Sequence, residues 1–190
     1  MIIERIEELH SNTYLVGNEK EFIIIDPSVD IRNINFVISK KFSTSKLVGI
    51  FLTHGHYDHF STLDDVLKKY KVPIYISKED QTKLSNINLS CAFFFGVTNL
   101  NEFENIINYK ADVQFETLRF QIYKTPGHTN GSVCIKIENN LFSGDTLFNN
   151  GVGRTDLPTG NEKQLIESLK YLMKLEKNLV VSNYKLQKKY

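Results

Sequence analysis

Short blocks of apolar residues, separated by polar turns, predict the elements of the first half of the chain. Alternating or continuous apolar runs predict strands at residues 2–6, 13–16, 21–26 and 47–53. Gly17 and Asn18 supply a hairpin turn between the second and third of these strands. A helix is expected over residues 31–41, and the strand at 47–53 is expected to be buried.

The spacing of apolar residues also predicts helices and strands in the second half of the chain. Apolar residues at helical spacing predict a helix that ends at Val72 and Pro73. Next come a strand at residues 74–76, a short helix near 78–84 and a polar segment through Tyr109. Strands follow at residues 113–115, 119–123, 133–137, 140–142 and 179–182. An amphipathic helix is expected over residues 161–175, with its apolar side chains inward: Leu165, Ile166, Leu169 and Leu172.

This order of elements indicates two halves of one architecture, each a sheet with helices outside it, and therefore an α/β (α+β) fold class. With 190 residues, of which 41% are hydrophobic, the chain can bury a sizeable core but has no room for a second domain. We therefore expect a single domain over residues 1–190. The aromatic residues 93–95 are expected to pack in its core, and the alternative is that they line a substrate entrance.

Charge and composition disfavour several classes of partner. The net charge of +1 provides no sustained field for nucleic acid or membranes, so a small molecule is the expected partner. The N-terminal residues 1–8 lack the apolar core of a signal peptide, which predicts a cytoplasmic protein. Cys91 and Cys134 are expected to be buried apolar groups rather than a disulfide. The oligomeric state is left open.

The strongest candidate chemistry follows the predicted strand at residues 47–53. His54, His56, Asp58 and His59 have the spacing H-x-H-x-D-H. Neutral imidazole nitrogens and carboxylate oxygens suit zinc, iron and manganese, whereas histidines that only face water have little reason to be so concentrated. In open α/β folds, sites are built at the carboxyl ends of strands. The cluster therefore predicts a metal site.

Two glycine turns carry further side chains of the ligand type. His128 stands in the segment TPGHTNGS, and Asp145 stands in the segment FSGDTLF, each shortly after a predicted strand. A Gly-Asp turn is usually only a turn, and a single histidine is more often structural. Because both strands could end at the same sheet edge as the first cluster, we expect metal roles for His128 and Asp145.

These motifs resemble those of the metallo-β-lactamase superfamily, and within it the glyoxalase-II-like, or hydroxyacylglutathione hydrolase-like, hydrolases. The resemblance runs from about residue 12 to about residue 175 and is carried by residues 53–59, 125–132, 144–148 and the loop at 151–160. It implies a four-layer αββα sandwich. It also implies two metal positions: His54, His56 and His128 on one ion, Asp58 and His59 on a second, and Asp145 as the bridge.

The end of the chain departs from the pattern of that family. Relatives carry one more histidine that ligates the second ion, whereas residues 178–190 contain none, and the C-terminus is shorter than in relatives. His10 is expected at the surface. The second position either binds weakly, with water filling the gap, or stays empty, and the amide oxygen of Asn183 is a candidate replacement. We expect one or two zinc ions, with iron or manganese as alternatives.

Metal chemistry and the resemblance together favour hydrolysis of an acyl bond. Divalent ions lower the pKa of a bound water toward ~7, which gives hydroxide at neutral pH, and they polarise a carbonyl oxygen. A thioester substrate of hydroxyacylglutathione type suits the site, because thiolates leave readily. Asp58 is expected to orient the hydroxide as well as to hold the second ion. Arg154 either contributes to substrate binding or pairs with Asp156 to brace its loop, and bracing is favoured.

The sequence leaves two alternatives to a hydrolase function. A single iron on His54, His128 and Asp145 matches the persulfide dioxygenases of the superfamily. A degenerate, non-catalytic relative that binds metal or a partner is consistent with the missing C-terminal histidine. A nuclease is disfavoured, because no basic face is visible.

Overall fold

The computed structural model describes residues 1–8, 11–175 and 180–181. His10 and Asn183 lie outside the described residues, as do the ends of the strand expected at 179–182. None of the helices in the described part of the chain has the length and apolar character that a membrane span needs.

The first sheet has six strands in the order β1-β2-β3-β4-β5-β6. Its strands are β1 (Ile2–Glu7), β2 (Asn12–Gly17), β3 (Glu21–Ile25), β4 (Lys46–Phe51), β5 (Ile74–Ile76) and β6 (Ile106–Asn108). The first three are antiparallel neighbours, whereas β3, β4, β5 and β6 pair in parallel. Parallel strands end at the same edge of a sheet, so the loops after β3, β4 and β5 lie together.

The second sheet has five strands in the order β13-β10-β9-β8-β7. They are β7 (Asp112–Gln114), β8 (Arg119–Lys124), β9 (Val133–Ile137), β10 (Asn140–Phe142) and β13 (Val180–Val181), and a small hairpin of β11 (Leu147–Phe148) and β12 (Gly151–Val152) follows β10. The helices are α1 (Ile31–Lys41), α2 (Leu63–Lys69) and α3 (Glu162–Leu175), with 3-10 turns η1 (Tyr57–His59), η2 (Gln81–Ser85) and η3 (Ala92–Phe95).

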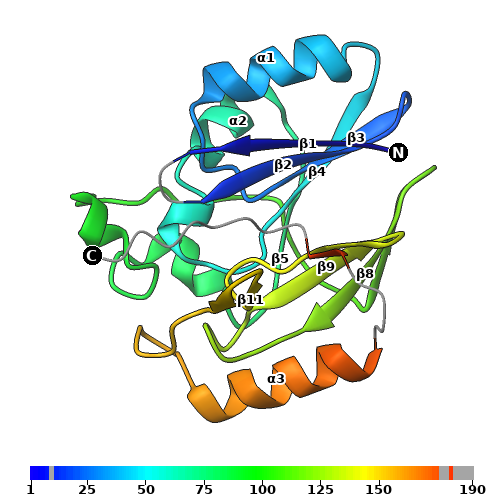
Figure 1. The fold of residues 1–190 in the computed structure, drawn as a ribbon. Coiled ribbons are helices and arrows are strands. Elements are labelled where there is room, and N and C mark those ends of the chain that lie inside the picture. Colours follow the sequence, from blue (N-terminus) through cyan, green and yellow to red (C-terminus); the bar gives the residue numbers. More distant parts are fainter. Residues whose placement is uncertain (9–10, 176–179, 182–190) are drawn as a thin grey trace.

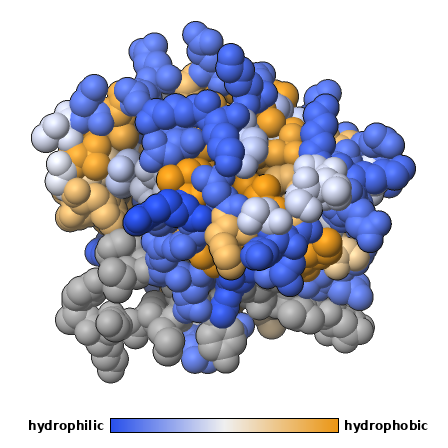
Figure 2. Space-filling view, turned by 90° about the horizontal axis from the view of Figure 1, so that it is seen from above, coloured by the Kyte–Doolittle hydropathy of each residue, from blue (hydrophilic) through white to orange (hydrophobic). Residues whose placement is uncertain are grey.

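The elements stack in four layers, as Figure 1 shows: α1 and α2 cover one sheet, the two sheets face each other, and α3 covers the second sheet. This arrangement confirms the predicted α/β sandwich. Seen from the side of α1, the outer surface is mostly hydrophilic, with hydrophobic side chains showing between the polar ones (Figure 2).

Side chains along the central strands alternate strictly between the two faces of their sheet, and this alternation produces the layers. In β3, Phe22 and Ile24 pack toward the helices, whereas Ile23 and Ile25 face the second sheet. In β9, the odd-numbered residues face the first sheet, and Cys134 faces α3 together with Leu172. Because successive side chains point to opposite faces of a strand, a strand that is buried on both faces reads as a continuous apolar run.

Several sequence predictions were wrong, for reasons that the packing explains. Ile166, expected inward on α3, is 45% exposed, and the inward stripe is formed by Leu165, Ser168 and Leu172. Phe93, Phe94 and Phe95, expected in the core, are 47%, 65% and 39% exposed. Other residues fill the core between the first sheet and its helices and the core between the two sheets. These apolar side chains therefore remain at the surface. The short strands β6, β11 and β12 were not predicted: β6 lies in the segment that was interpreted as polar, and β11 and β12 have only two residues each.

Replacing Phe51 with alanine is expected to destabilise the fold by about 3–5 kcal/mol, the range for large aromatic residues in a core. Phe51 is fully buried between the sheets, and its ring centroid lies 4.6 Å from that of Tyr75 and 5.1 Å from that of Phe120. Denaturant unfolding measures the loss. Phe36→Ala is the control, because Phe36 is 62% exposed on α1 and should cost less than about 0.5 kcal/mol. Similar losses in both variants would contradict this packing.

Candidate metal centre

Three loops at one edge of the two sheets carry the candidate ligands. His54, His56, Asp58 and His59 follow β4, with the last two inside the turn η1. His128 lies in the loop between β8 and β9, and Asp145 lies between β10 and β11. The loops come from both sheets, so the site forms only when the two sheets pack.

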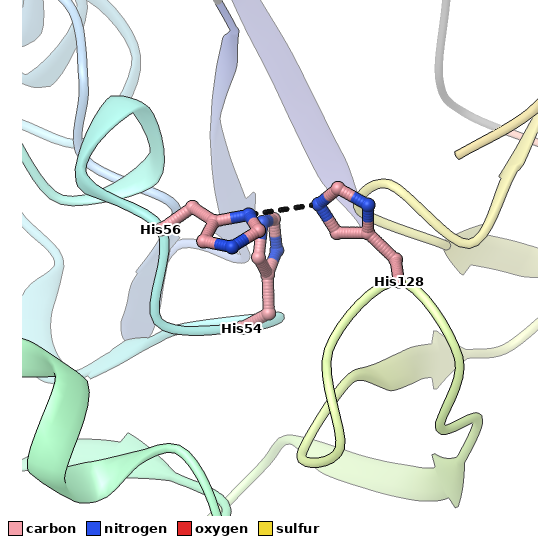
Figure 3. A group of neighbouring side chains, drawn as sticks. All are labelled: His54, His56 and His128. Carbon is pink, nitrogen blue, oxygen red and sulfur yellow. Dashed lines mark hydrogen bonds between the residues drawn. The ribbon is translucent and has the colours of Figure 1, made fainter. Parts of the chain in front are cut away.

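His54, His56 and His128 form the first group. Each offers a ring nitrogen within 4.8 Å of the other two, and their exposed fractions are only 1%, 3% and 2%. Figure 3 shows the rings of His54 and His56 on one loop and that of His128 facing them from the opposite loop. His56 Nδ1 and His128 Nε2 lie 2.9 Å apart, at hydrogen-bond distance.

The backbone carbonyl group of Arg154 fixes the ring orientation of His128. Its Nδ1 donates a hydrogen bond of 2.7 Å to the carbonyl oxygen of Arg154, so this nitrogen carries the proton. In the neutral form of this ring, the other nitrogen, Nε2, presents a lone pair toward His54 and His56. This is the arrangement that a metal-binding histidine requires, because only an unprotonated nitrogen can bind a cation.

His54, His59 and Asp145 form a second group, whose ligand atoms also lie within 4.8 Å of one another. His59 Nε2 is 3.1 Å from Asp145 Oδ1 and 3.9 Å from Asp58 Oδ2. Asp145 Oδ2 lies 3.7 Å from His128 Nε2, so the two carboxylate oxygens of Asp145 face both groups. The structure thus brings five of the six candidate ligands together at one centre, and Asp58 lies beside it, next to His59.

Asp26, which is not among the candidate ligands in the sequence, braces this second group. Its Oδ2 lies 2.9 Å from His59 Nδ1 and accepts a hydrogen bond of 2.7 Å from Thr53 Oγ1. Its Oδ1 accepts another, of 2.8 Å, from the backbone N–H of Thr53. Asp26 follows β3 directly, and β3 and β4 are parallel neighbours. An acidic residue just after a buried strand is the signal that could have identified it.

Burial and neighbouring charges give the histidines opposite protonation preferences. Burial lowers the pKa of His54 well below its usual value, and repulsion from His59 adds to this effect. Burial and the nearby His128 lower the pKa of His56 to about 2. Burial would also lower the pKa of His59, but the carboxylates of Asp26, Asp145 and Asp58 outweigh it and raise the pKa to about 10. His54 and His56 are therefore neutral at physiological pH, whereas His59 is protonated in the metal-free centre and would have to lose a proton to bind a cation.

The donor set fits a divalent cation. The Nε2 atoms of His54, His56 and His59 are buried and have no hydrogen-bond partner, even though Asp145 Oδ1 lies 3.1 Å from the last of them. A buried polar nitrogen without a partner costs about 1–3 kcal/mol. Three such nitrogens beside carboxylates are explained by a cation that they would hold together.

Arg154 does not direct its charged group at the histidines. Its Nε and one terminal nitrogen each donate a hydrogen bond of 2.6 Å to the carboxylate of Asp156. The contribution of Arg154 to the centre is the backbone carbonyl oxygen that accepts from His128. This geometry matches the bracing role favoured from the sequence.

Gly144 allows the Asp145 loop to approach the loop after β4, which carries His54. Its φ is +49°, a left-handed conformation that favours glycine. A Cβ at this position would lie 2.6 Å from Thr53 Cβ, which is closer than two carbon atoms can pack. A side chain here would therefore push Asp145 away from His54.

A sequence model described as the metallo-beta-lactamase superfamily matches residues 6–182. The chain belongs to the metallo-β-lactamase superfamily. Members of this superfamily bind divalent metal ions, which agrees with the histidine cluster described above. The α/β sandwich and the four-layer arrangement are the fold of its solved neighbours.

Curated relatives of this superfamily include proteins described as metallo-hydrolases. The chain is 31% identical over 182 residues to "Probable metallo-hydrolase YqgX" of Bacillus subtilis, covering 93% of this chain and 85% of the relative. It is 31% identical over 170 residues to "Hydroxyacylglutathione hydrolase GloC" of Haemophilus influenzae, covering 86% and 79%. These relationships place the protein among the metallo-hydrolases of the superfamily.

Solved structures give the same fold. The B3 metallo-β-lactamase BLEG-1 superposes with a TM-score of 0.86 at 27% identity, covering 95% of this chain and 90% of that one. The protein TTHA1623, solved in a di-iron-bound form, superposes with a TM-score of 0.81 at 26% identity and the same coverage. The metal bound by that neighbour is iron, so the fold by itself does not select zinc.

Proposed function

We propose that this metallo-hydrolase cleaves a thioester of the hydroxyacylglutathione type, with one or two zinc ions as its cofactor. The observation that carries the proposal is the convergence of four buried histidines and Asp145 at one sheet edge, with imidazole nitrogens that lack partners. The similarity to a hydroxyacylglutathione hydrolase over most of both chains supports the choice of substrate class.

Each residue of the centre has a separate task in this proposal. His54, His56 and His128 would hold one divalent ion, and His59, Asp58 and Asp145 would hold a second. A divalent ion at this centre supplies an acidified water and polarises the carbonyl oxygen of the substrate. The neutral state of His54 and His56 keeps their lone pairs available.

Asp58 is the candidate for handling the proton of the attacking water. Its side chain is 20% exposed, compared with 4% for His59, so it lies on the solvent side of the centre. We assign Asp58 Oδ2 to accept a hydrogen bond from the water and to orient it toward the carbonyl carbon. A thiolate can leave without being protonated first, so a thioester needs no separate general acid.

A panel of substrates tests the reaction class. We expect kcat/KM for S-lactoylglutathione to exceed kcat/KM for a chromogenic β-lactam by at least a hundredfold, even though BLEG-1 is described as a B3 metallo-β-lactamase. Steady-state kinetics with the zinc-loaded protein measures both values. A preference for the β-lactam, or hydrolysis of neither substrate, would overturn the thioester proposal.

The exposed aromatic residues 93–95 are expected to contact the apolar part of the substrate. The ring of Phe95 lies 5.6 Å from that of Tyr57, which begins the turn that contains Asp58 and His59. Phe95→Ala should raise KM for apolar acyl thioesters about five- to tenfold and leave kcat unchanged, because about 1–1.4 kcal/mol of apolar contact is lost. Phe36→Ala, which removes an exposed ring on α1, is the control. An unchanged KM in Phe95→Ala would contradict this role.

A further inference from the structure

Asp80 and Lys83 form an ion pair that is buried next to the metal centre but contributes no ligand to it. Asp80 directly precedes η2 and Lys83 lies within it. Lys83 Nζ is 2.7 Å from Asp80 Oδ1, and their side chains are only 1% and 0% exposed. Neither residue belongs to a motif that the sequence singles out.

The carboxylate of Asp80 contacts both histidine-bearing loops. Its Oδ2 accepts a hydrogen bond of 2.8 Å from the backbone N–H of Gly55, the residue between His54 and His56. The same oxygen accepts a hydrogen bond of 2.7 Å from Thr129 Oγ1, in the residue after His128. One oxygen atom thus joins the loop after β4 to the loop between β8 and β9.

Lys83 extends this connection. Its Nζ donates a second hydrogen bond, of 2.8 Å, to Asn130 Oδ1, in the same loop as His128. The backbone of the other loop passes directly over its side chain, since a Cβ on Gly55 would lie 2.7 Å from Lys83 Cβ. Each loop therefore contacts both members of the pair.

Burying an ion pair costs free energy. We therefore expect this pair to have a role in holding the two histidine-bearing loops in place. Removing two charges from water costs several kcal/mol for each ion, and apolar side chains of similar volume often stabilise a fold equally well. Here the pair satisfies a buried backbone N–H at Gly55 and a buried hydroxyl at Thr129, which apolar side chains could not do.

We propose that Asp80 and Lys83 are positioning residues of the metal centre: they hold the loops of His54, His56 and His128 at the separation that lets the three imidazoles share one ion. This proposal rests on the ligand set proposed above. It does not depend on the substrate. Asp80 Oδ2 is the atom that joins the two loops. Lys83 fixes the orientation of the Asp80 carboxylate and neutralises its charge.

Two double variants separate the hydrogen bonds of Asp80 from its charge. Asp80→Asn with Lys83→Met removes both charges but retains an acceptor oxygen at position 80. Asp80→Ala with Lys83→Met removes both charges and the acceptor. The affinity of each folded, metal-free protein for Zn²⁺ is measured by competition with a chromophoric chelator, and circular dichroism checks the fold.

We expect the Asn/Met variant to bind Zn²⁺ within about threefold of the parent, and the Ala/Met variant to bind it about 10- to 100-fold more weakly, the usual effect of losing an outer partner of a metal site. The visible spectrum of the Co²⁺-loaded protein should change only in the Ala/Met variant. Equal affinity in the parent and the Ala/Met variant, or equal losses in both variants, would overturn the proposal. Because the readout is zinc affinity, failure of the thioester proposal would not affect this result.

Thr129 provides an independent test if the double variants do not fold. Thr129→Val keeps the shape of the fully buried side chain but removes the hydroxyl that donates to Asp80. Thr129→Ser keeps the hydroxyl and is the matched control. We expect weaker Zn²⁺ binding, by about tenfold, in the valine variant and near-parental binding in the serine variant. Equal affinities in the two variants would overturn the proposal.

Discussion

Asp145→Ala is expected to lower kcat/KM for thioester hydrolysis more than the roughly 100-fold seen when only an outer partner of a metal site is removed. The two oxygens of Asp145 face His59 and His128, at 3.1 and 3.7 Å, so its loss weakens both parts of the centre. His56→Ala should have an effect of the same size, because it removes a nitrogen from the three-histidine group. Steady-state kinetics and metal content of each purified variant measure the loss.

The control for these variants is Asp112→Ala, which removes an exposed carboxylate on β7, outside the metal centre. It should retain full activity. The Asp145 and His56 variants should keep the parental circular dichroism spectrum, because both residues lie in loops rather than in the core. Full activity in either variant would remove that residue from the ligand set.

Removing the metal ions is expected to lower the melting temperature of the protein by roughly 10 °C. A ligand present at 1,000 times its Kd stabilises the folded state by about 4 kcal/mol, and each kcal/mol shifts the melting temperature of a domain of this size by about 2–4 °C. Without an ion, three buried imidazole nitrogens lack partners. Thermal unfolding of zinc-loaded and chelator-treated protein measures the difference.

The matched control for this experiment is the His56→Ala variant, in which the chelator should cause a much smaller shift. Re-addition of Zn²⁺ to the treated parent should restore its melting temperature. A parent protein whose melting temperature is the same with and without chelator would show that the folded state binds no ion tightly.

The sequence predicted that the candidate ligands lie close together, and the structure confirms this for His54, His56, His59, His128 and Asp145, because their positions depend on local chain geometry. The H-x-H-x-D-H spacing follows a continuous apolar run, and a buried parallel strand delivers whatever follows it to the carboxyl edge of the sheet. His128 and Asp145 each follow a strand that was also predicted. The four-layer arrangement came from the family resemblance, and the alternation along β3 and β9 accounts for it physically.

Residues that act across long sequence separations could not be found in this way. Asp26 braces Thr53 and His59 from 27 and 33 residues away, and Asp80 reaches Thr129 across 49 residues. Single acidic residues at strand ends are common, and their partners are set by tertiary packing. The exposure of residues 93–95 was missed for the same reason, because an aromatic run looks the same in a core and at a surface.

The most direct test of the central claim is the turnover of S-lactoylglutathione, measured as a function of the zinc bound per chain. Metal-free protein is titrated with Zn²⁺, and bound metal is determined by mass spectrometry on the samples used for kinetics. We predict no hydrolysis without metal and a rate that rises with occupancy up to one or two ions per chain. Hydrolysis by the metal-free protein, or a fully loaded protein without thioesterase activity, would contradict the account.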